Sequence, residues 1–193
     1  MSEERPAGTP MSDEELQDLV ASTDTGGRNP AGSAGKIILG VALLWSLFQI
    51  WIASPLPFAL GFAVFNDWDS RSIHLAFAIF LTYLAYPAAK RSPRHYIPIH
   101  DWMMAFVAAF SAAYLFLFAD ELATRPGNPN TIDIIVASIG IILLLEATRR
   151  ALGPPLMIVA IVFLLYPFGG PHMPGILAWK GASFGAIASH QWT

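Results

Sequence analysis

Residues 131–150, with the sequence TIDIIVASIGIILLLEATRR, constrain the fold more than any other part of this chain. Between residues 134 and 145 the stretch has no charged side chain, and only Ser138 and Gly140 interrupt its apolar residues. A helix at the surface of a soluble domain carries a polar stripe along one side, and this stretch has none. We therefore expect a helix that crosses a membrane or is enclosed by other membrane helices.

The end of this helix carries three charged residues, Glu146, Arg149 and Arg150. Their i, i+3 and i+4 spacing places them on one helical face, so the acid can pair with either arginine. Basic side chains are favourable at a helix C-terminus, and beside a membrane span they tend to stay on the cytoplasmic side. We expect Glu146 and the arginines to pair with one another or with a neighbouring domain at the cytoplasmic edge of the membrane.

The composition points to the same class of protein. The chain of 193 residues is 54% hydrophobic and only 13% charged. Soluble domains, by contrast, carry roughly 25% charged residues. The sequence has no basic patch, so we expect no nucleic-acid partner. It also has no cysteine, which excludes disulfides and thiolate metal sites.

Five apolar runs are candidates for membrane spans. They cover residues 37–53, 73–89, 102–119, 131–150 and 156–168. The last run reaches only about 20 Å as a helix, short of the ~30 Å hydrocarbon layer, so it is thin or tilted. We therefore predict an all-α, polytopic integral membrane helical bundle with four spans and a short fifth.

The polar and apolar segments divide the chain into three parts. Residues 1–35 form a polar tail with a short amphipathic helix at 12–21, and residues 36–150 form a four-span domain. Residues 151–193 hold the short fifth span, an interfacial segment from residue 176 onward and a junction on the periplasmic side. Because the chain stops without a polar tail, we expect it to continue into a further domain.

Lysine and arginine residues are distributed unequally between the two ends of the predicted spans. Leaving out the distant Arg5, seven lie beside one end and three beside the other. The first group is Arg28, Lys36, Lys90, Arg91, Arg94, Arg149 and Arg150, and the second is Arg71, Arg125 and Lys180. Since positive residues accumulate on the cytoplasmic side, we predict a cytoplasmic N-terminus.

A few polar residues lie within or beside the spans. Gln49 is the one amide inside the first span, and we expect it to hydrogen-bond to another helix. His74 lies just inside the second span, where a hydrogen bond to a neighbouring helix is favoured over a role in a proton path. We predict that Asp101 caps the helix that starts at residue 102 and that Thr131 caps the helix at 131–150.

The sequence gives no reason to expect an enzyme. It has no Gly-x-Ser-x-Gly, His-Glu-x-x-His or glycine-rich nucleotide motif and no acid pair inside a span. We therefore predict no catalytic, metal or cofactor site. An intramembrane enzyme would have to use His74 with Asp101, and the predicted topology puts these residues at opposite faces of the membrane.

Several short stretches carry a family resemblance through their order and spacing. They are DTGGR at 24–28 with Pro30, RSIHLAF at 71–77 leading to Tyr86 and Pro87, Asp101 with Trp102, LLLEATRR at 143–150 with Gly153, YPFGGPHMPG at 166–175, and Ser189 with His190. Together they resemble the N-terminal portion of fused permeases of tripartite ATP-independent periplasmic (TRAP) transporters. The resemblance is to the subgroup that works with TAXI-type solute-binding proteins.

The resemblance implies a role in secondary active transport in the bacterial inner membrane. In the family, a periplasmic binding protein delivers an organic acid, a large domain moves it with sodium, and a small membrane domain braces the large one. The present chain resembles the small domain with its junction. Its implied partners are therefore a large transport domain, fused or separate, a TAXI-type binding protein and membrane lipid. Substrate and sodium sites lie in the large domain, so no site residue carries over.

A second class of function fits the same residues. A stand-alone membrane anchor or assembly module would have the same apolar spans and would use the helix at 12–21 as its docking element. The two classes differ in their dependence on the tail. We expect a transporter brace to tolerate loss of the tail and an anchor to fail without it.

Overall fold

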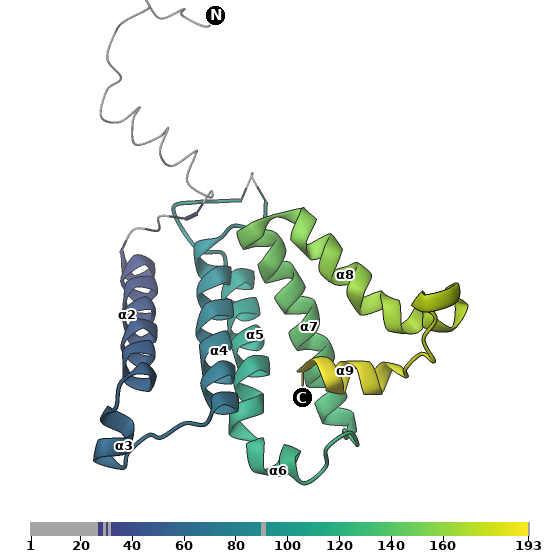
Figure 1. The fold of residues 1–193 in the computed structure, drawn as a ribbon. Coiled ribbons are helices and arrows are strands. Elements are labelled where there is room, and N and C mark those ends of the chain that lie inside the picture. The colour runs from purple at the N-terminus through teal and green to yellow at the C-terminus, as the bar shows by residue number, and fades with distance from the viewer. Residues whose placement is uncertain (1–26, 29, 31, 90–91, 193) are drawn as a thin grey trace, which may run out of the picture.

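The computed structural model describes residues 27–28, 30, 32–89 and 92–192, and this part of the chain is helical, as predicted (Figure 1). The helices are α2 (Ser33–Ala53), α3 (Leu56–Leu60), α4 (Asp67–Ala85), α5 (Ile99–Leu117), α6 (Ala119–Ala123), α7 (Thr131–Leu152), α8 (Pro154–Gly169) and α9 (Phe184–Trp192). Two short 3-10 turns, Gly170–His172 and Gly175–Leu177, lie between α8 and α9. The helix predicted at 12–21 lies outside the described residues.

Four of the described helices are long and apolar enough to cross a membrane. They are α2, α5, α7 and α8, the last continued to His172. The run predicted as a short fifth span is thus among the four, because the helix starts at Pro154 and includes the turn after Gly169. Helix α4, which contains most of the run predicted as the second span, is not among these four helices. Asp67, Asp69 and Arg71 occupy its first two turns and make the helix too polar over its length. The class of multi-pass helical membrane protein is confirmed.

The centre of the molecule is the pair α4 and α5, with α2 on one side and α7 on the other (Figure 1). The main core lies between these helices. Its buried residues are Ile79, Tyr83, Leu84, Ile97, Ala105, Ala108 and Ala147. The alanines on α5 and α7 are fully or nearly fully buried, which allows the helix backbones to approach closely.

Successive long helices run in alternating directions, as Figure 1 shows for α2, α4, α5 and α7. The start of α2, the end of α4, the start of α5 and the end of α7 therefore lie at one end of the bundle. This end contains Arg28, Arg94 and Arg150, while Arg71 and Arg125 lie at the other. The predicted uneven distribution of basic residues thus corresponds to two physical ends.

Helix α9 differs from the predicted interfacial segment, because it turns back and packs across α5 and α7. Trp192, 6% exposed, donates its indole N–H to the backbone oxygen of Ser111 at 3.0 Å. Its ring packs against Gly140, where a Cβ atom would come within 2.7 Å of Cη2 and closer still to two other ring atoms. One face of α9, with Ile187, Ala188 and Trp192, is buried because small residues on α5 and α7 leave room for it.

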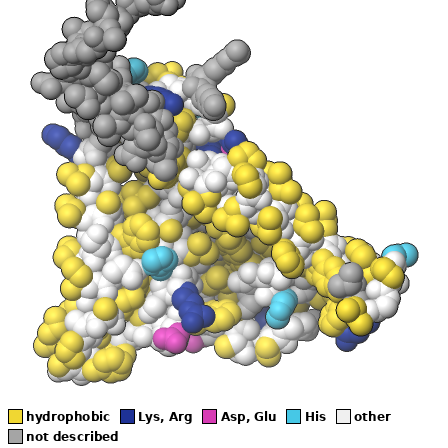
Figure 2. All heavy atoms as spheres, turned by 45° about the horizontal axis from the view of Figure 1, so that its top comes forward, with side chains coloured by type: hydrophobic (Ala, Val, Ile, Leu, Met, Phe, Trp, Pro, Cys, Tyr) yellow, Lys and Arg dark blue, Asp and Glu magenta, His cyan; other side chains and the backbone are white. Residues whose placement is uncertain are grey.

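The outer faces of the bundle are strongly apolar. Among the described residues, neither α2 nor α8 contains a buried one, and both present large aliphatic and aromatic side chains outward. Figure 2 shows hydrophobic side chains over most of one face, with few charges among them. Such a surface needs lipid or other membrane helices as its surroundings.

Candidate functional site

A buried carboxylate organises one end of the bundle. Asp101 lies in the first turn of α5 and its side chain is fully buried. The predicted cap is wrong: Pro98 occupies the N-cap position of α5 and no side chain caps it. The carboxylate instead accepts hydrogen bonds from two guanidinium groups, those of Arg28 and Arg150. Because an ion in this position is removed from water, it is stable only when such partners surround it.

Arg28 reaches the carboxylate from the segment before α2. Its Nη2 donates to Oδ2 of Asp101, Nε donates to the backbone oxygen of Pro93 at 3.2 Å, and Nη1 donates to that of Tyr83 at 3.2 Å. The Arg28 backbone N–H also donates to the backbone oxygen of Ala85 at 2.6 Å. These hydrogen bonds thus hold the segment before α2 against the end of α4, although this segment falls within the predicted polar tail.

Arg150 approaches Asp101 from the end of α7. Its Nη1 donates to Oδ1 of Asp101 at 2.8 Å and its Nε to Oε1 of Glu146 at 2.8 Å. The guanidinium carbon lies 4.6 Å from the centroid of the Tyr83 ring, so the cation also faces an aromatic surface. The Tyr83 hydroxyl in turn donates to the backbone oxygen of Leu143 at 2.8 Å, which joins α4 to α7.

Glu146 and Arg149 complete the group. Arg149 donates from Nε and Nη2 to the two carboxylate oxygens of Glu146, each at 2.7 Å. Its Nη2 also donates to the backbone oxygen of Ala88, beyond the end of α4. The predicted pairing of Glu146 with the arginines is confirmed. We call Arg28, Asp101, Glu146, Arg149 and Arg150 the charge network.

The charge network joins four segments that are distant in sequence: the segment before α2, the end of α4, the start of α5 and the end of α7. Each of its two carboxylates has two guanidinium partners. Among the described residues, every buried side-chain nitrogen and oxygen atom has a hydrogen-bond partner. Removing one member of such a group leaves buried charges unpaired, which costs ~3–5 kcal/mol, so the network fixes the relative positions of the helices.

A second buried acid organises the opposite end. Asp133, 1% exposed, accepts from the hydroxyl of Tyr114 at 2.7 Å and from Nε of Arg125 at 2.9 Å. The hydrogen bond to Asp133 is the main cause that raises the pKa of Arg125 above its ordinary value. Asn130 forms a reciprocal capping box with Asp133, so it and not Thr131 is the N-cap of α7. Asp133 is thus part of the cap of α7, and it also accepts a hydrogen bond from α5 and pairs with a cation in the loop after α6.

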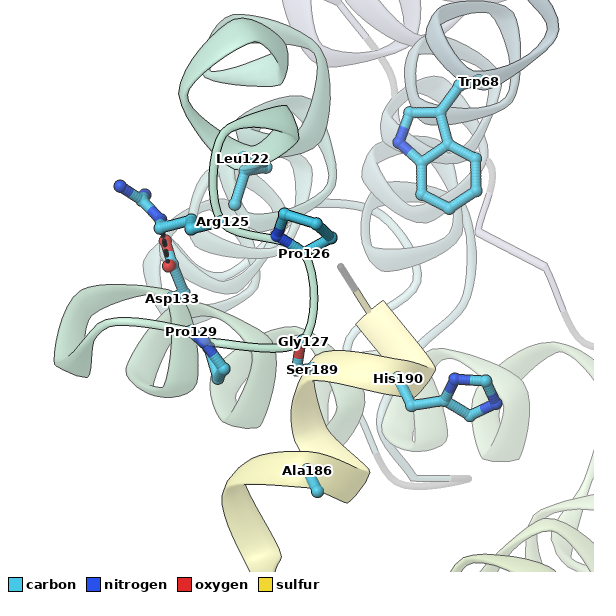
Figure 3. Close-up of a pocket in the computed structure, with 10 residues that line it drawn as sticks. All are labelled: Trp68, Leu122, Arg125, Pro126, Gly127, Pro129, Asp133, Ala186, Ser189 and His190. Carbon is cyan, nitrogen blue, oxygen red and sulfur yellow. Dashed lines mark hydrogen bonds and ion pairs between the residues drawn. The ribbon is translucent and has the colours of Figure 1, made fainter.

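Beside this acid lies a pocket of about 350 Å³ between the first turn of α4, the loop after α6 and helix α9 (Figure 3). Its lining residues are Trp68, Leu122, Arg125, Pro126, Gly127, Pro129, Asp133, Ala186, Ser189 and His190. In Figure 3 the Arg125 guanidinium is turned toward Asp133, away from Trp68 and His190. Its hydrogen bonds to Asp133 therefore hold this cation at the side of the pocket, away from the Trp68 and His190 rings.

Gln49 and His74, the two polar residues predicted inside spans, contact each other. Nδ1 of His74 on α4 contacts the side-chain nitrogen of Gln49 on α2 and accepts from the indole N–H of Trp45 at 3.3 Å. The expectation that Gln49 and His74 hydrogen-bond to a neighbouring helix is confirmed. His74 and Asp101 have different partners on different helices, so the structure does not bring together the pair that an intramembrane enzyme would need.

Four members of these two groups were not predicted from the sequence: Arg28, Arg125, Asp133 and Tyr114. From the sequence, Arg28 and Arg125 count only as basic residues that indicate the orientation of the spans. A signal was present for Asp133, because Asn130 followed by an acid three residues later is a capping pattern. Nothing local indicates the roles of Arg28 and Tyr114, since both depend on contacts between distant segments.

Within the described residues no group of three or more histidines or acids could hold a metal ion. Comparisons with protein-family models, with curated proteins and with solved structures found no match for this chain.

Proposed function

We propose that this chain is the bracing membrane component of a TRAP-type secondary transporter, in which a separate or fused large domain takes up an organic acid with sodium. The observation that carries the proposal is the saturated charge network. A helical part that moves ions or substrate needs open polar groups inside the membrane. In the charge network both carboxylates are already paired within the chain.

Two further features support a bracing role. The apolar outer faces of α2 and α8 offer extended surfaces for membrane partners. The stretches that resemble the family also include all five members of the charge network, Arg28, Asp101, Glu146, Arg149 and Arg150. In the proposed orientation the network lies at the cytoplasmic edge, with the N-terminus in the cytoplasm, and a TAXI-type binding protein meets the transporter on the other side.

Glu146→Ala tests the role of the network in assembly. The change leaves Arg149 without its carboxylate partner and removes one of the two acids that pair with Arg150, a loss of charged hydrogen bonds worth ~1.5–3 kcal/mol. We expect about tenfold less of the assembled transporter in mild-detergent extracts of membranes. The half-saturating substrate concentration for uptake by the remaining complexes should be unchanged.

The matched control is Glu121→Ala, which removes an exposed acid outside the network. It should leave both the amount of complex and uptake unchanged. A normal amount of complex with an altered half-saturating concentration in Glu146→Ala would contradict a purely bracing role.

Two N-terminal deletions separate the brace from the stand-alone anchor. Removing residues 1–26 leaves Arg28 and its contacts with Asp101 in place, so we expect the brace to assemble normally. The expectation that a brace tolerates loss of the whole tail is corrected by the contact between Arg28 and Asp101: removing residues 1–28 takes away Arg28, leaves Asp101 with one cationic partner in place of two, and should reduce assembly. If the shorter deletion already abolishes the chain's cellular activity, the anchor is the better account.

A further inference from the structure

His74 carries a hydrogen-bond donor that the described part of the chain does not use. The indole N–H of Trp45 can only donate, so Nδ1 of His74 is an acceptor and the proton of the neutral ring lies on Nε2. No residue that the structure describes accepts a hydrogen bond from Nε2. The imidazole is nevertheless exposed on the outer surface of the bundle.

The position of His74 makes an unused donor costly. It lies about one turn farther along α4 than Arg71, and the seven residues that follow it, LAFAIFL at 75–81, are all apolar. On the facing helix, Leu47 and Ile50 lie at the same level along α2 as Trp45 and Gln49, and they are 61% and 65% exposed, so apolar side chains cover the outside of the bundle at this level. In surroundings of this kind, water is scarce and an unpaired N–H group costs several kcal/mol. An acceptor from outside the chain would remove this cost.

An apolar groove adjoins the imidazole. It has a volume of about 300 Å³ and lies between α2, α4 and α5. Its lining residues are Val41, Ile73, Ala76, Phe77, Phe80, Ala109 and Ala113. Val41 lies one turn from Trp45 on α2, and Phe77 lies one turn from His74 on α4, so the groove and the polar group adjoin along both helices.

We propose that this surface, made of the groove with Trp45, Gln49 and His74, is the docking site for a membrane helix that presents a hydrogen-bond acceptor to Nε2 of His74. Association of membrane helices depends on small residues that permit close approach and on hydrogen bonds between polar side chains. The three alanines of the groove permit close approach of another helix, and His74 provides the hydrogen bond. A lipid could fill the groove with an acyl chain, but it could accept from Nε2 only through its ester or phosphate oxygens, so the nature of the cross-linked partner distinguishes a lipid from a helix. If the proposed function is correct, the docking helix belongs to the large transport domain. Only this identification of the helix rests on the proposed function.

Photo-cross-linking in native membranes tests the docking site with the full chain. A photoreactive benzoylphenylalanine at position 41 would face the groove. At position 47 it would face outward, because Leu47 lies about 200° around α2 from Trp45. We expect position 41 to cross-link to a membrane helix that carries a polar acceptor side chain, and position 47 to cross-link to lipid. Cross-links from both positions to lipid alone would overturn the proposal.

Two substitutions test the hydrogen bond itself. His74→Leu removes the donor and should lower the cross-linked fraction from position 41 about tenfold, while His74→Gln keeps an N–H donor and should retain most of it. Unchanged thermal midpoints in both variants would show that the bundle stays folded. An undiminished cross-link in His74→Leu would overturn the proposal. A cross-link to a helix outside any transporter would support the docking site and contradict the proposed function. Cross-links to lipid alone, in a chain that still assembles into a transporter, would contradict the docking site and support the proposed function.

Discussion

Asp101→Asn is expected to lower the thermal unfolding midpoint of the detergent-solubilised chain by about 10 °C. The substitution keeps the size of the side chain and removes its charge, so the guanidinium groups of Arg28 and Arg150 lose the carboxylate that they share. Both cations are almost fully buried, and an uncompensated buried charge costs ~3–5 kcal/mol. Asp120→Asn, which changes an exposed acid after α5, should leave the midpoint within experimental error.

A double-mutant cycle checks that the effect arises from the ion pair. Arg28→Gln should destabilise the chain on its own, because it leaves Asp101 with one cationic partner in place of two. Combined with Asp101→Asn, it should cost clearly less than the sum of the two single changes, since the unpaired cation is no longer present. Strict additivity would show that the two residues do not interact, and would contradict the charge network.

Gly140→Ala is expected to release α9 from the bundle. The added methyl group would overlap the indole of Trp192, and the ring cannot easily move because it is buried and donates to the backbone of Ser111. Overpacking of this kind costs ~1–3 kcal/mol, and here the strain is relieved by displacing the short helix. The measurement is hydrogen exchange of the α9 amides, which should become faster.

Gly40→Ala is the matched control, because it makes the same change within helix α2, where the added group would meet no side chain and no other element within 4 Å among the described residues. Alanine is also the better helix former, so this variant should be as stable as the parent or slightly more stable. Adding Trp192→Ala to Gly140→Ala should cause no further exposure of α9 beyond that of Trp192→Ala alone. Slow exchange of α9 in Gly140→Ala would contradict the packing described for Trp192.

The parts of the fold that could be predicted are those fixed by local pattern. The long apolar runs specify helices because each run is apolar on all sides, and the pairing of Glu146 with Arg149 and Arg150 follows from helical spacing alone. The apolar run that starts at residue 73 does not indicate where helix α4 starts. The helix begins at Asp67 because Asn66 caps it by accepting from the backbone N–H of Asp69.

The parts that could not be predicted depend on contacts between distant segments. Asp101 lies 73 residues from Arg28 and 49 from Arg150, and spacing along one helix carries no information about such pairs. The burial of α9 was missed for the same reason. Gly140 was visible in the sequence as an interruption of an apolar run, but only the folded chain shows that Trp192 fills the space above it.

The size of the native chain and the proteins that copurify with it test the central claim most directly. An antibody against residues 1–30 can follow the protein through denaturing gels and mild-detergent extraction of bacterial membranes. The bracing role predicts one of two results: a band several-fold larger than 21.0 kDa, or a chain of this size that copurifies with a many-helix membrane protein required for sodium-dependent uptake of an organic acid. A chain of 21.0 kDa that purifies without any multi-span partner would contradict it.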